Sequence, residues 1–199
     1  MKIIGLTGGS GAGKGTVAKL MESFGAVSYD ADKIYHSLID SESECSKRII
    51  DAFGDEIRNE DGGVLTSALS KIVFSDREKL TVLNNIAHKY VCAEYDKIIE
   101  AEKKKGTTMF VIDAPQLFES GMNKICDVTV AVISKKENRV ERIISRDNIS
   151  YDRAVARISA QYSDDFFIKN CDYVIENDKD AAHLLFLVKE VISRLKEDG

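Results

Sequence analysis

Short apolar runs recur at five places along the chain, and each is four to six residues long. They are rich in isoleucine, valine and aromatic residues, which favour extended structure. Runs that are apolar throughout, rather than alternating, are typical of strands buried on both faces of a parallel sheet. The predicted strands are Ile3–Thr7, Ala26–Tyr29, Met109–Ala114, Val128–Ile133 and Tyr173–Glu176.

Longer segments with helical periodicity separate these runs, over residues 15–24, 33–105, 136–170 and 179–196. In the last segment, apolar residues recur at spacings of three and four, which places them on one helical face directed toward the sheet. That face consists of Ala181, Leu184, Leu185, Val188, Val191, Ile192 and Leu195. Alternating strands and helices predict an α/β fold, a parallel five-stranded sheet flanked by helices.

The segment 33–105 is too long for one crossover helix, and it contains turn signals at Gly54 and at residues 61–63. We therefore expect a helical insertion over about 33–105, between the second and third strands. A chain of 199 residues is typical of one domain. The insertion is expected to be part of that single domain, 1–199.

The charge balance narrows the range of partners. The chain carries 28 basic and 33 acidic residues, a net charge of -5, which argues against a general nucleic-acid or anionic-membrane binder. No apolar run approaches the roughly 20 residues that span a bilayer. The four cysteines lack the spacing of a metal site. We expect a cytoplasmic protein with reduced thiols, either a monomer or a small homo-oligomer.

A glycine-rich segment follows the first predicted strand and opens the first predicted helix. In that context, glycines let backbone N–H groups turn around a phosphate, the helix N-terminus adds a positive dipole end, and a lysine reaches the β and γ phosphates. The segment is therefore predicted to be a P-loop that binds a nucleotide. Its binding residues are Gly9, Ser10, Gly11, Ala12, Gly13, Lys14, Gly15 and Thr16.

The P-loop departs from the common pattern at one position. Gly15 follows the lysine where most P-loops have a hydroxyl that binds Mg²⁺, and Thr16 comes next. We expect Mg²⁺ to be held mainly by phosphate oxygens, water and a carboxylate, with Thr16 touching a phosphate. Asp113, which ends the third strand, is the candidate carboxylate and would act through water.

Two acids stand at the end of the second predicted strand, Asp30 and Asp32, separated by Ala31. The carboxyl edge of a parallel sheet is where α/β proteins bind ligands. Phosphoryl transfer to an alcohol needs a group that orients the hydroxyl and accepts its proton. Asp32 is the candidate, because strand alternation would direct Asp30 to the other face. One of the two acids could instead cap the following helix.

Five of the nine arginines lie within residues 139–157. Arg142 and Arg146 are four apart on one predicted helix, which a break at 147–148 separates from the next. In an acidic chain this clustering indicates a lid, about 139–165, that brings cations onto the transferring phosphates. The alternative is an exposed helix face with ordinary surface ion pairs.

Taken together, these features resemble the dephospho-coenzyme A kinases over nearly the whole chain. The resemblance rests on the following motifs, in this order: Leu6-Thr7-Gly8-Gly9 before the P-loop, Asp30-Ala31-Asp32, Pro115-Gln116-Leu117-Phe118-Glu119, Arg142 and Arg146 followed by Ala156-Arg157-Ile158-Ser159-Ala160-Gln161, and Asp172-Tyr173-Val174-Ile175-Glu176-Asn177.

The resemblance implies a role for several residues. In that family the second acid of the Asp-Ala-Asp motif is the catalytic base, which corresponds to Asp32. The P-loop lysine corresponds to Lys14, the lid arginines to Arg142 and Arg146, and the adenine-site asparagine to Asn177. ATP and Mg²⁺ are the implied cofactors, and dephospho-coenzyme A is the implied small-molecule partner.

The chain departs from the family pattern at three places. Gly15-Thr16 stands where Ser-Thr is usual, as in adenylate kinases; Lys89 stands where a proline often follows the histidine; and Thr66 lies near a usual arginine. The last two departures fall in the insertion expected to hold the acceptor. They bear on acceptor contacts more than on the ATP site.

The function implied is ATP-dependent phosphorylation of the ribose 3'-hydroxyl of dephospho-coenzyme A, which gives coenzyme A and ADP and is the last step of coenzyme A biosynthesis. Two alternatives stay open. A nucleoside monophosphate kinase is favoured by the Gly-Lys-Gly-Thr sequence, and a non-catalytic nucleotide-dependent switch would share the P-loop.

Overall fold

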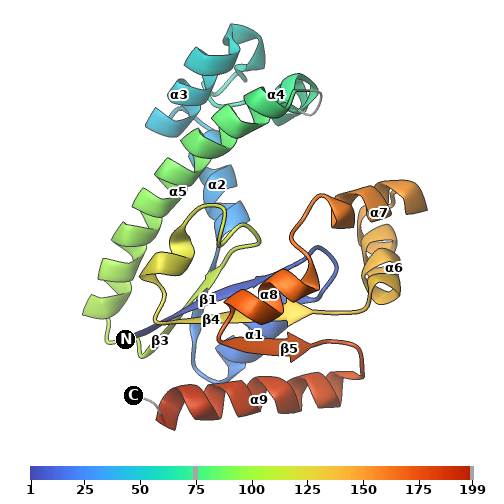
Figure 1. Cartoon of the computed structure of the whole chain (residues 1–199). Coiled ribbons are helices and arrows are strands. Elements are labelled where there is room, and N and C mark those ends of the chain that lie inside the picture. Colours follow the sequence, from blue (N-terminus) through green and yellow to red (C-terminus); the bar gives the residue numbers. More distant parts are fainter. Residues whose placement is uncertain (74–75, 198–199) are drawn as a thin grey trace. The chain divides into compact units, whose positions relative to one another are not determined.

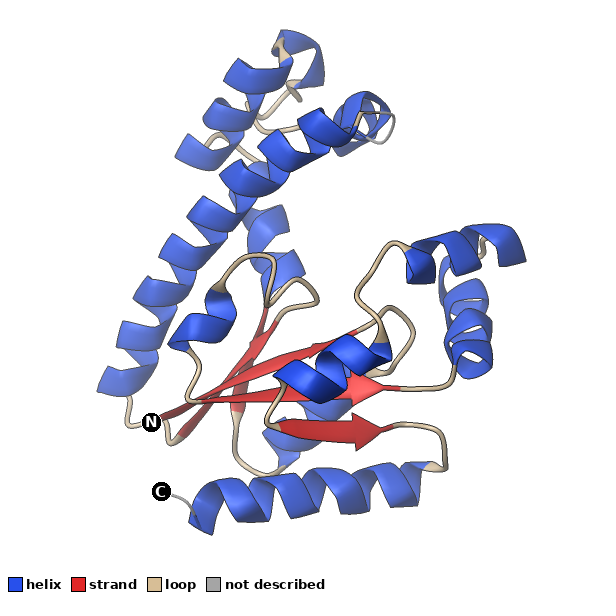
Figure 2. Ribbon diagram, viewed as in Figure 1, coloured by secondary structure: helices blue, strands red, loops and turns tan. Residues whose placement is uncertain are grey.

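Five strands form one sheet in the order β2-β3-β1-β4-β5 (Figure 2). β1 pairs in parallel with β3 and β4, and β4 pairs in parallel with β5. The bounds are β1 Lys2–Gly8, β2 Val27–Asp30, β3 Met109–Asp113, β4 Val128–Ile133 and β5 Tyr173–Glu176. The predicted parallel five-stranded sheet flanked by helices is confirmed.

The structure is a computed structural model that describes residues 1–73 and 76–197. Positions 74 and 75, within the helical segment expected over 33–105, lie outside the described residues, as do positions 198 and 199.

Helices occupy the intervals between the strands (Figure 1). Their bounds are α1 Lys14–Ser23, α2 Ala31–Ile39, α3 Glu44–Phe53, α4 Thr66–Val73, α5 Arg77–Lys104, α6 Lys136–Asp147, α7 Tyr151–Ser159, α8 Asp164–Asn170 and α9 Ala181–Glu197, with 3-10 turns at Asp55–Ile57 and Met122–Ile125. The predicted break at 147–148 is confirmed, because Asn148 ends α6 with a left-handed φ of 50°.

Alternate residues of β4 serve the two faces of the sheet. Val128, Val130 and Val132 pack in the main core with α1 and α9. Ala131, on the other face, packs in a smaller cluster with Phe167 of α8. The apolar run seen in the sequence is thus explained by burial of both faces.

The apolar stripe of α9 is narrower than its sequence pattern predicts. Leu184, Val188, Val191, Ile192 and Leu195 are buried against the sheet. The assignment of Ala181 and Leu185 to this stripe is wrong, since both are exposed. Each residue turns a helix by about 100°, so Leu185 lies to the side of the row that Leu184 begins.

The chain forms two compact units, one of Met1–Tyr29 with Glu102–Gly199 and the other Asp30–Ala101. The second unit is helical and has its own core, which includes Ile39, Ile49 and Leu69. The sequence breaks are real: Gly54 ends α3 with a φ of 101°, and Gly62 forms a turn with a φ of 76°.

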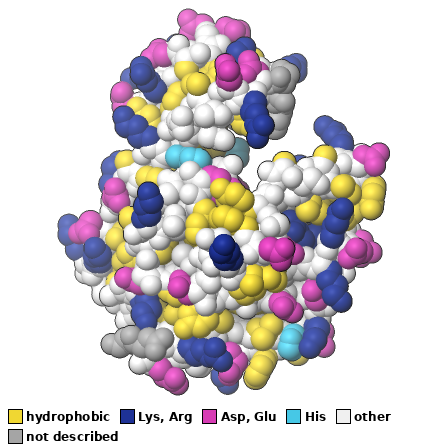
Figure 3. Space-filling model, viewed as in Figure 1, with side chains coloured by type: hydrophobic (Ala, Val, Ile, Leu, Met, Phe, Trp, Pro, Cys, Tyr) yellow, Lys and Arg dark blue, Asp and Glu magenta, His cyan; other side chains and the backbone are white. Residues whose placement is uncertain are grey.

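Charged side chains of both signs are interspersed on the face that Figure 3 displays. None of the helices within 1–73 and 76–197 combines the length and apolarity needed to cross a membrane. The four cysteines are free thiols. Burial raises the pKa of the Cys126 thiol to about 12, which makes it unreactive at neutral pH.

Candidate active site

The phosphate loop spans residues 9–13, between the end of β1 and the start of α1. Gly13 is the N-cap of α1, with a φ of 99°. Its carbonyl accepts hydrogen bonds from the N–H groups of Thr16 at 3.0 Å and Val17 at 3.2 Å, so the helix begins directly after the loop. The first turn carries no acidic side chain, which leaves the positive end of the helix dipole to an anion.

Two glycines of the loop are required by what packs behind them. A Cβ on Gly13 would lie 2.1 Å from Nδ2 of Asn177, and a Cβ on Gly11 would lie 2.5 Å from the backbone oxygen of Arg139. Both glycines also have positive φ, 99° and 78°, which L side chains rarely adopt. The loop is therefore shaped by the residues that support it from outside as well as by its own flexibility.

Lys14 forms an ion pair with Asp113, at the end of β3. The side chains are only 17% and 6% exposed, respectively. Such a pair is retained because each charge compensates the desolvation of the other. The lysine predicted to bind phosphates and the carboxylate predicted to hold Mg²⁺ through water are thus direct neighbours.

Arg142 and Asn177 lie behind the loop and hold its carbonyl groups. Arg142 Nη1 donates to the Gly11 carbonyl and to Ser134 Oγ, each at 3.2 Å, and Nη2 donates to the Asn177 carbonyl at 2.9 Å. Asn177 Nδ2 donates to the Ala12 carbonyl at 2.8 Å. These bonds occupy carbonyls of the loop and leave N–H groups such as those of Gly11 and Gly13 for phosphate, whereas the Ala12 N–H donates to the Gly9 carbonyl at 3.1 Å.

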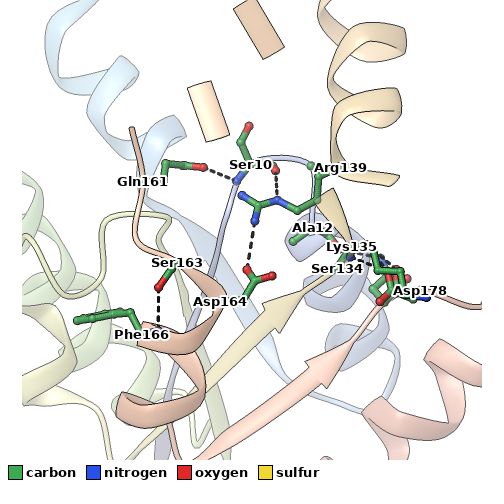
Figure 4. Close-up of polar contacts among 12 residues, drawn as sticks. Ser10, Ala12, Ser134, Lys135, Arg139, Gln161, Ser163, Asp164, Phe166 and Asp178 are labelled. Atoms are coloured by element: carbon green, nitrogen blue, oxygen red, sulfur yellow. Dashed lines mark hydrogen bonds and ion pairs between the residues drawn. The ribbon is translucent and has the colours of Figure 1, made fainter. Parts of the chain in front are cut away.

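Asp178, which lies just after β5, accepts hydrogen bonds from residues at the start of α6 (Figure 4). Its Oδ1 accepts from Ser134 Oγ at 2.7 Å, the Lys135 N–H at 2.8 Å and Asn138 Nδ2 at 3.0 Å. Burial alone would raise the pKa of Asp178, but these hydrogen bonds outweigh it and lower the pKa. The carboxylate thus stays charged and fixes α6, which carries Arg142.

Arg146 has a different environment from Arg142. It is exposed, with 61% of its side chain accessible, and it pairs with Asp147 at 2.7 Å. Asp147 also accepts from Arg157 of α7. Hydrogen bonds from Arg146, and then from Arg157, lower the pKa of Asp147 to about 2. The sequence grouped Arg142 and Arg146 together, but Arg142 is bound to the phosphate loop and Arg146 lies at the corner between α6 and α7.

The backbone N–H and carbonyl of Ser10 are held by two side chains of the segment 139–165 (Figure 4). Gln161 Oε1 accepts from the Ser10 N–H at 2.7 Å, and Arg139 Nε donates to the Ser10 carbonyl at 2.9 Å. Arg139 Nη1 donates in turn to Asp164 Oδ1 at 3.1 Å. Burial lowers the pKa of Arg139, and Asp164 opposes that effect.

Sequence reasoning gives no role to Arg139 or Gln161. Two sequence features could have pointed to these residues: the arginine cluster that contains Arg139 and the motif that ends in Gln161. Both features appear in the sequence, but only the fold brings Arg139 and Gln161 to the same residue, Ser10.

The two acids after β2 do not both belong to the strand. β2 ends at Asp30, and Asp32 lies in the first turn of α2. Asp30 is the N-cap of this helix and accepts from the N–H groups of Asp32 at 2.9 Å and Lys33 at 3.3 Å. The expected strand alternation of the two acids is therefore wrong, because a capping aspartate starts a helix there.

The parallel sheet, the glycine loop that opens α1 and the partly buried Lys14–Asp113 pair define the class of P-loop kinases. The sequence model of the family described as "Dephospho-CoA kinase" matches residues 2–183. The chain belongs to this dephospho-CoA kinase family.

Individual relatives agree with the family match. The dephospho-CoA kinase of Fusobacterium nucleatum is 41% identical over 182 residues, 92% of each chain. That of Carboxydothermus hydrogenoformans is 38% identical over 177 residues, 89% of this chain and 86% of the relative. The solved dephospho-CoA kinase from Campylobacter jejuni is 27% identical, has a TM-score of 0.72 and covers 100% of this chain and 99% of its own. The activity is therefore ATP-dependent phosphorylation of dephospho-coenzyme A in coenzyme A biosynthesis.

Proposed function

We propose that this kinase transfers the γ-phosphate of ATP to the ribose 3'-hydroxyl of dephospho-coenzyme A, with Asp32 as the base. The observation that carries the proposal is the loop itself, whose carbonyls are tied outward while Lys14 stands at its inner end beside Asp113. Such a loop binds a phosphate chain through N–H groups and one lysine.

Phosphate binding falls to Lys14, to the loop N–H groups of residues 9–13 other than those of Ser10 and Ala12, which already donate to Gln161 and Gly9, and to the first turn of α1. The space beside Gly15 is open, since no atoms lie within 4 Å of where its Cβ would be, and the Thr16 hydroxyl is the nearby donor. A phosphate oxygen competes with Asp113 for the lysine ammonium. In the ATP complex, Lys14 therefore shares its charge between Asp113 and the phosphates.

The residues fit Mg²⁺ that is brought in with the phosphates. Within the described residues, no three or more His, Cys, Asp or Glu side chains form a group that could hold a metal ion. Mg²⁺ keeps several waters and binds phosphate oxygens when protein ligands are few. Asp113 would hold it through water, as proposed from the sequence. When bound, Mg²⁺ neutralises charge on the phosphate oxygens.

Asp32 orients the 3'-hydroxyl and accepts its proton. The acceptor oxygen forms a bond to the γ-phosphorus as the bond from that phosphorus to the β–γ bridging oxygen breaks, and ADP leaves with the electron pair. Because the Asp30 side chain caps α2, Asp32 is the acid that we assign to proton acceptance. The acceptor is expected to lie on the helical segment 33–105, where Thr66 opens α4 and Lys89 lies on α5.

Arg142 and Arg146 supply positive charge to the transferring phosphoryl group in the closed state of the lid, residues 139–165. Arg146 is exposed and free to move with the lid, apart from its pair with Asp147. Arg142 contributes its charge from its place beside the loop, where it keeps its hydrogen bonds to the loop carbonyls. Asn177, next to the loop at the end of β5, is the proposed adenine-site residue.

The test is ADP release with dephospho-coenzyme A, AMP, CMP or no acceptor. We expect release only with dephospho-coenzyme A, and coenzyme A as the product. Faster release with AMP or CMP would identify a nucleoside monophosphate kinase. Release that is independent of acceptor would indicate a nucleotide-hydrolysing switch.

A further inference from the structure

Ser10 is the one loop residue whose N–H and carbonyl are both bonded to side chains outside the loop, among the hydrogen bonds of the described residues. Its N–H donates to Gln161 at 2.7 Å and its carbonyl accepts from Arg139 at 2.9 Å (Figure 4). The two side chains approach from different elements. Arg139 lies on α6, and Gln161 lies in the link between α7 and α8.

Arg139 is a fixed anchor. It is only 4% exposed, its backbone lies against Gly11, and Asp164 at the start of α8 binds its Nη1. Its Nη2 is buried without a hydrogen-bond partner in the part of the chain that the structure describes. Leaving a donor unpaired is costly, so the position of this guanidinium is set by the loop and Asp164 rather than by its own hydrogen-bonding needs.

Gln161 is the less buried of the two residues whose side chains bond Ser10. It is only half-buried and follows the end of α7 by two residues. Its neighbour Tyr162 stacks on Phe166 of α8, so the position of the α7–α8 link, and with it the bond to Ser10, is tied to the packing of α8. A glycine-rich loop has many accessible conformations, and restraining them before the ligand arrives removes an entropic cost from binding.

We propose that Gln161 is a positioning residue for ATP, which together with Arg139 and Asp164 forms a clamp on Ser10. The clamp holds the phosphate loop in its binding conformation and couples it to the segment 139–165. This inference rests on the proposed role of the loop in binding ATP phosphates. Gln161 acts through Ser10 and touches no reacting atom.

The experiment compares Gln161→Leu, which removes the acceptor, with Gln161→Glu, which keeps an oxygen at the same reach. Asn170→Leu is the matched control, because this amide lies on α8 and donates to the Phe166 carbonyl of its own helix. Three quantities are measured: hydrogen exchange of the Ser10 amide without ligand, Kd and KM for ATP, and Tm.

For Gln161→Leu we expect faster exchange at Ser10 and a Kd and KM for ATP raised about tenfold, the scale of one lost hydrogen bond. Tm and the KM for dephospho-coenzyme A should match wild type. Gln161→Glu should restore the protection of the Ser10 amide, and Asn170→Leu should behave as wild type.

Unchanged ATP affinity in Gln161→Leu would overturn the inference. A fall in Tm with parallel losses for both substrates would also overturn it, because that pattern indicates only a structural role. Failure of the wild-type enzyme to bind ATP would instead refute the proposed phosphate site. The exchange of Ser10 in the free protein would still report on the clamp.

Discussion

At the scale of single residues, the ion pair of Lys14 and Asp113 links stability to phosphate binding. Both side chains are mostly buried, so removing one partner takes from the other the opposite charge that offsets its desolvation. A variant at Lys14 therefore changes two properties, and a design is needed that separates them.

Lys14→Ala should nearly abolish phosphoryl transfer, because the loop loses the side chain that neutralises phosphate charge. It should also lower Tm, since Asp113 loses its ion pair with Lys14. The double variant Lys14→Ala with Asp113→Asn should recover much of the Tm and none of the transfer. Steady-state assays and thermal unfolding measure the two effects, and normal turnover in folded Lys14→Ala would refute the P-loop role.

Asp32→Asn should lower kcat by roughly 10²- to 10⁴-fold, the range for removal of a positioned base. The amide can still hydrogen-bond the hydroxyl, so binding of both substrates should persist. Asp30→Asn is the control, because asparagine caps a helix about as well as aspartate, and its kcat and Tm should stay near wild type. If Asp30→Asn lost more activity than Asp32→Asn, the base would have to be reassigned.

At the scale of elements, the loop is held by hydrogen bonds from elements that lie far from it in the sequence. α6 supplies Arg139 and Arg142, the end of β5 supplies Asn177, and the α7–α8 link supplies Gln161. The corner between α6 and α7 is instead joined by exposed charges around Asp147. We expect the corner to be the more mobile of the two regions, because exposed ion pairs contribute little.

Arg146→Ala should reduce kcat more than it raises the KM for ATP, since a lid cation acts when closure brings it onto developing charge. Arg157→Ala is a matched control that removes the other partner of Asp147. Either truncation should bring the pKa of Asp147 up from about 2, as carboxyl NMR titration can follow. Equal kcat for both variants would leave Arg146 with only a structural role.

The pairing around Asp147 also has a pH signature. Its folded pKa lies below the ordinary value of 3.8, so its contribution to stability is present above that value and is lost as the pH falls toward 2. At neutral pH the corner is therefore fully paired.

At the scale of the whole molecule, the strands were predictable because burial of both faces produces uninterrupted apolar runs. Val128–Ile133 is one example, and the same positions form β4. The P-loop was predictable because its glycines, lysine and flanking elements are contiguous. The helix start at Ala31 was only one of two alternatives, since a capping Asp30 and a strand-ending Asp30 look alike in sequence.

The long-range supports of the loop could not be read from the sequence. Ser10 and Gln161 are 151 residues apart, and no local periodicity relates them. Arg139 stood among five clustered arginines, and nothing in their spacing distinguished a buried anchor from the exposed Arg146. Such contacts depend on how α6, which follows β4, and α8 are placed relative to the sheet.

The most direct test of the central claim is the position and stoichiometry of phosphate transfer, followed by ³¹P NMR with dephospho-coenzyme A and MgATP. We predict a new phosphomonoester on the ribose 3'-oxygen and one ADP for each coenzyme A formed. A phosphate at the 2'-oxygen, or ADP without a phosphorylated acceptor, would contradict it.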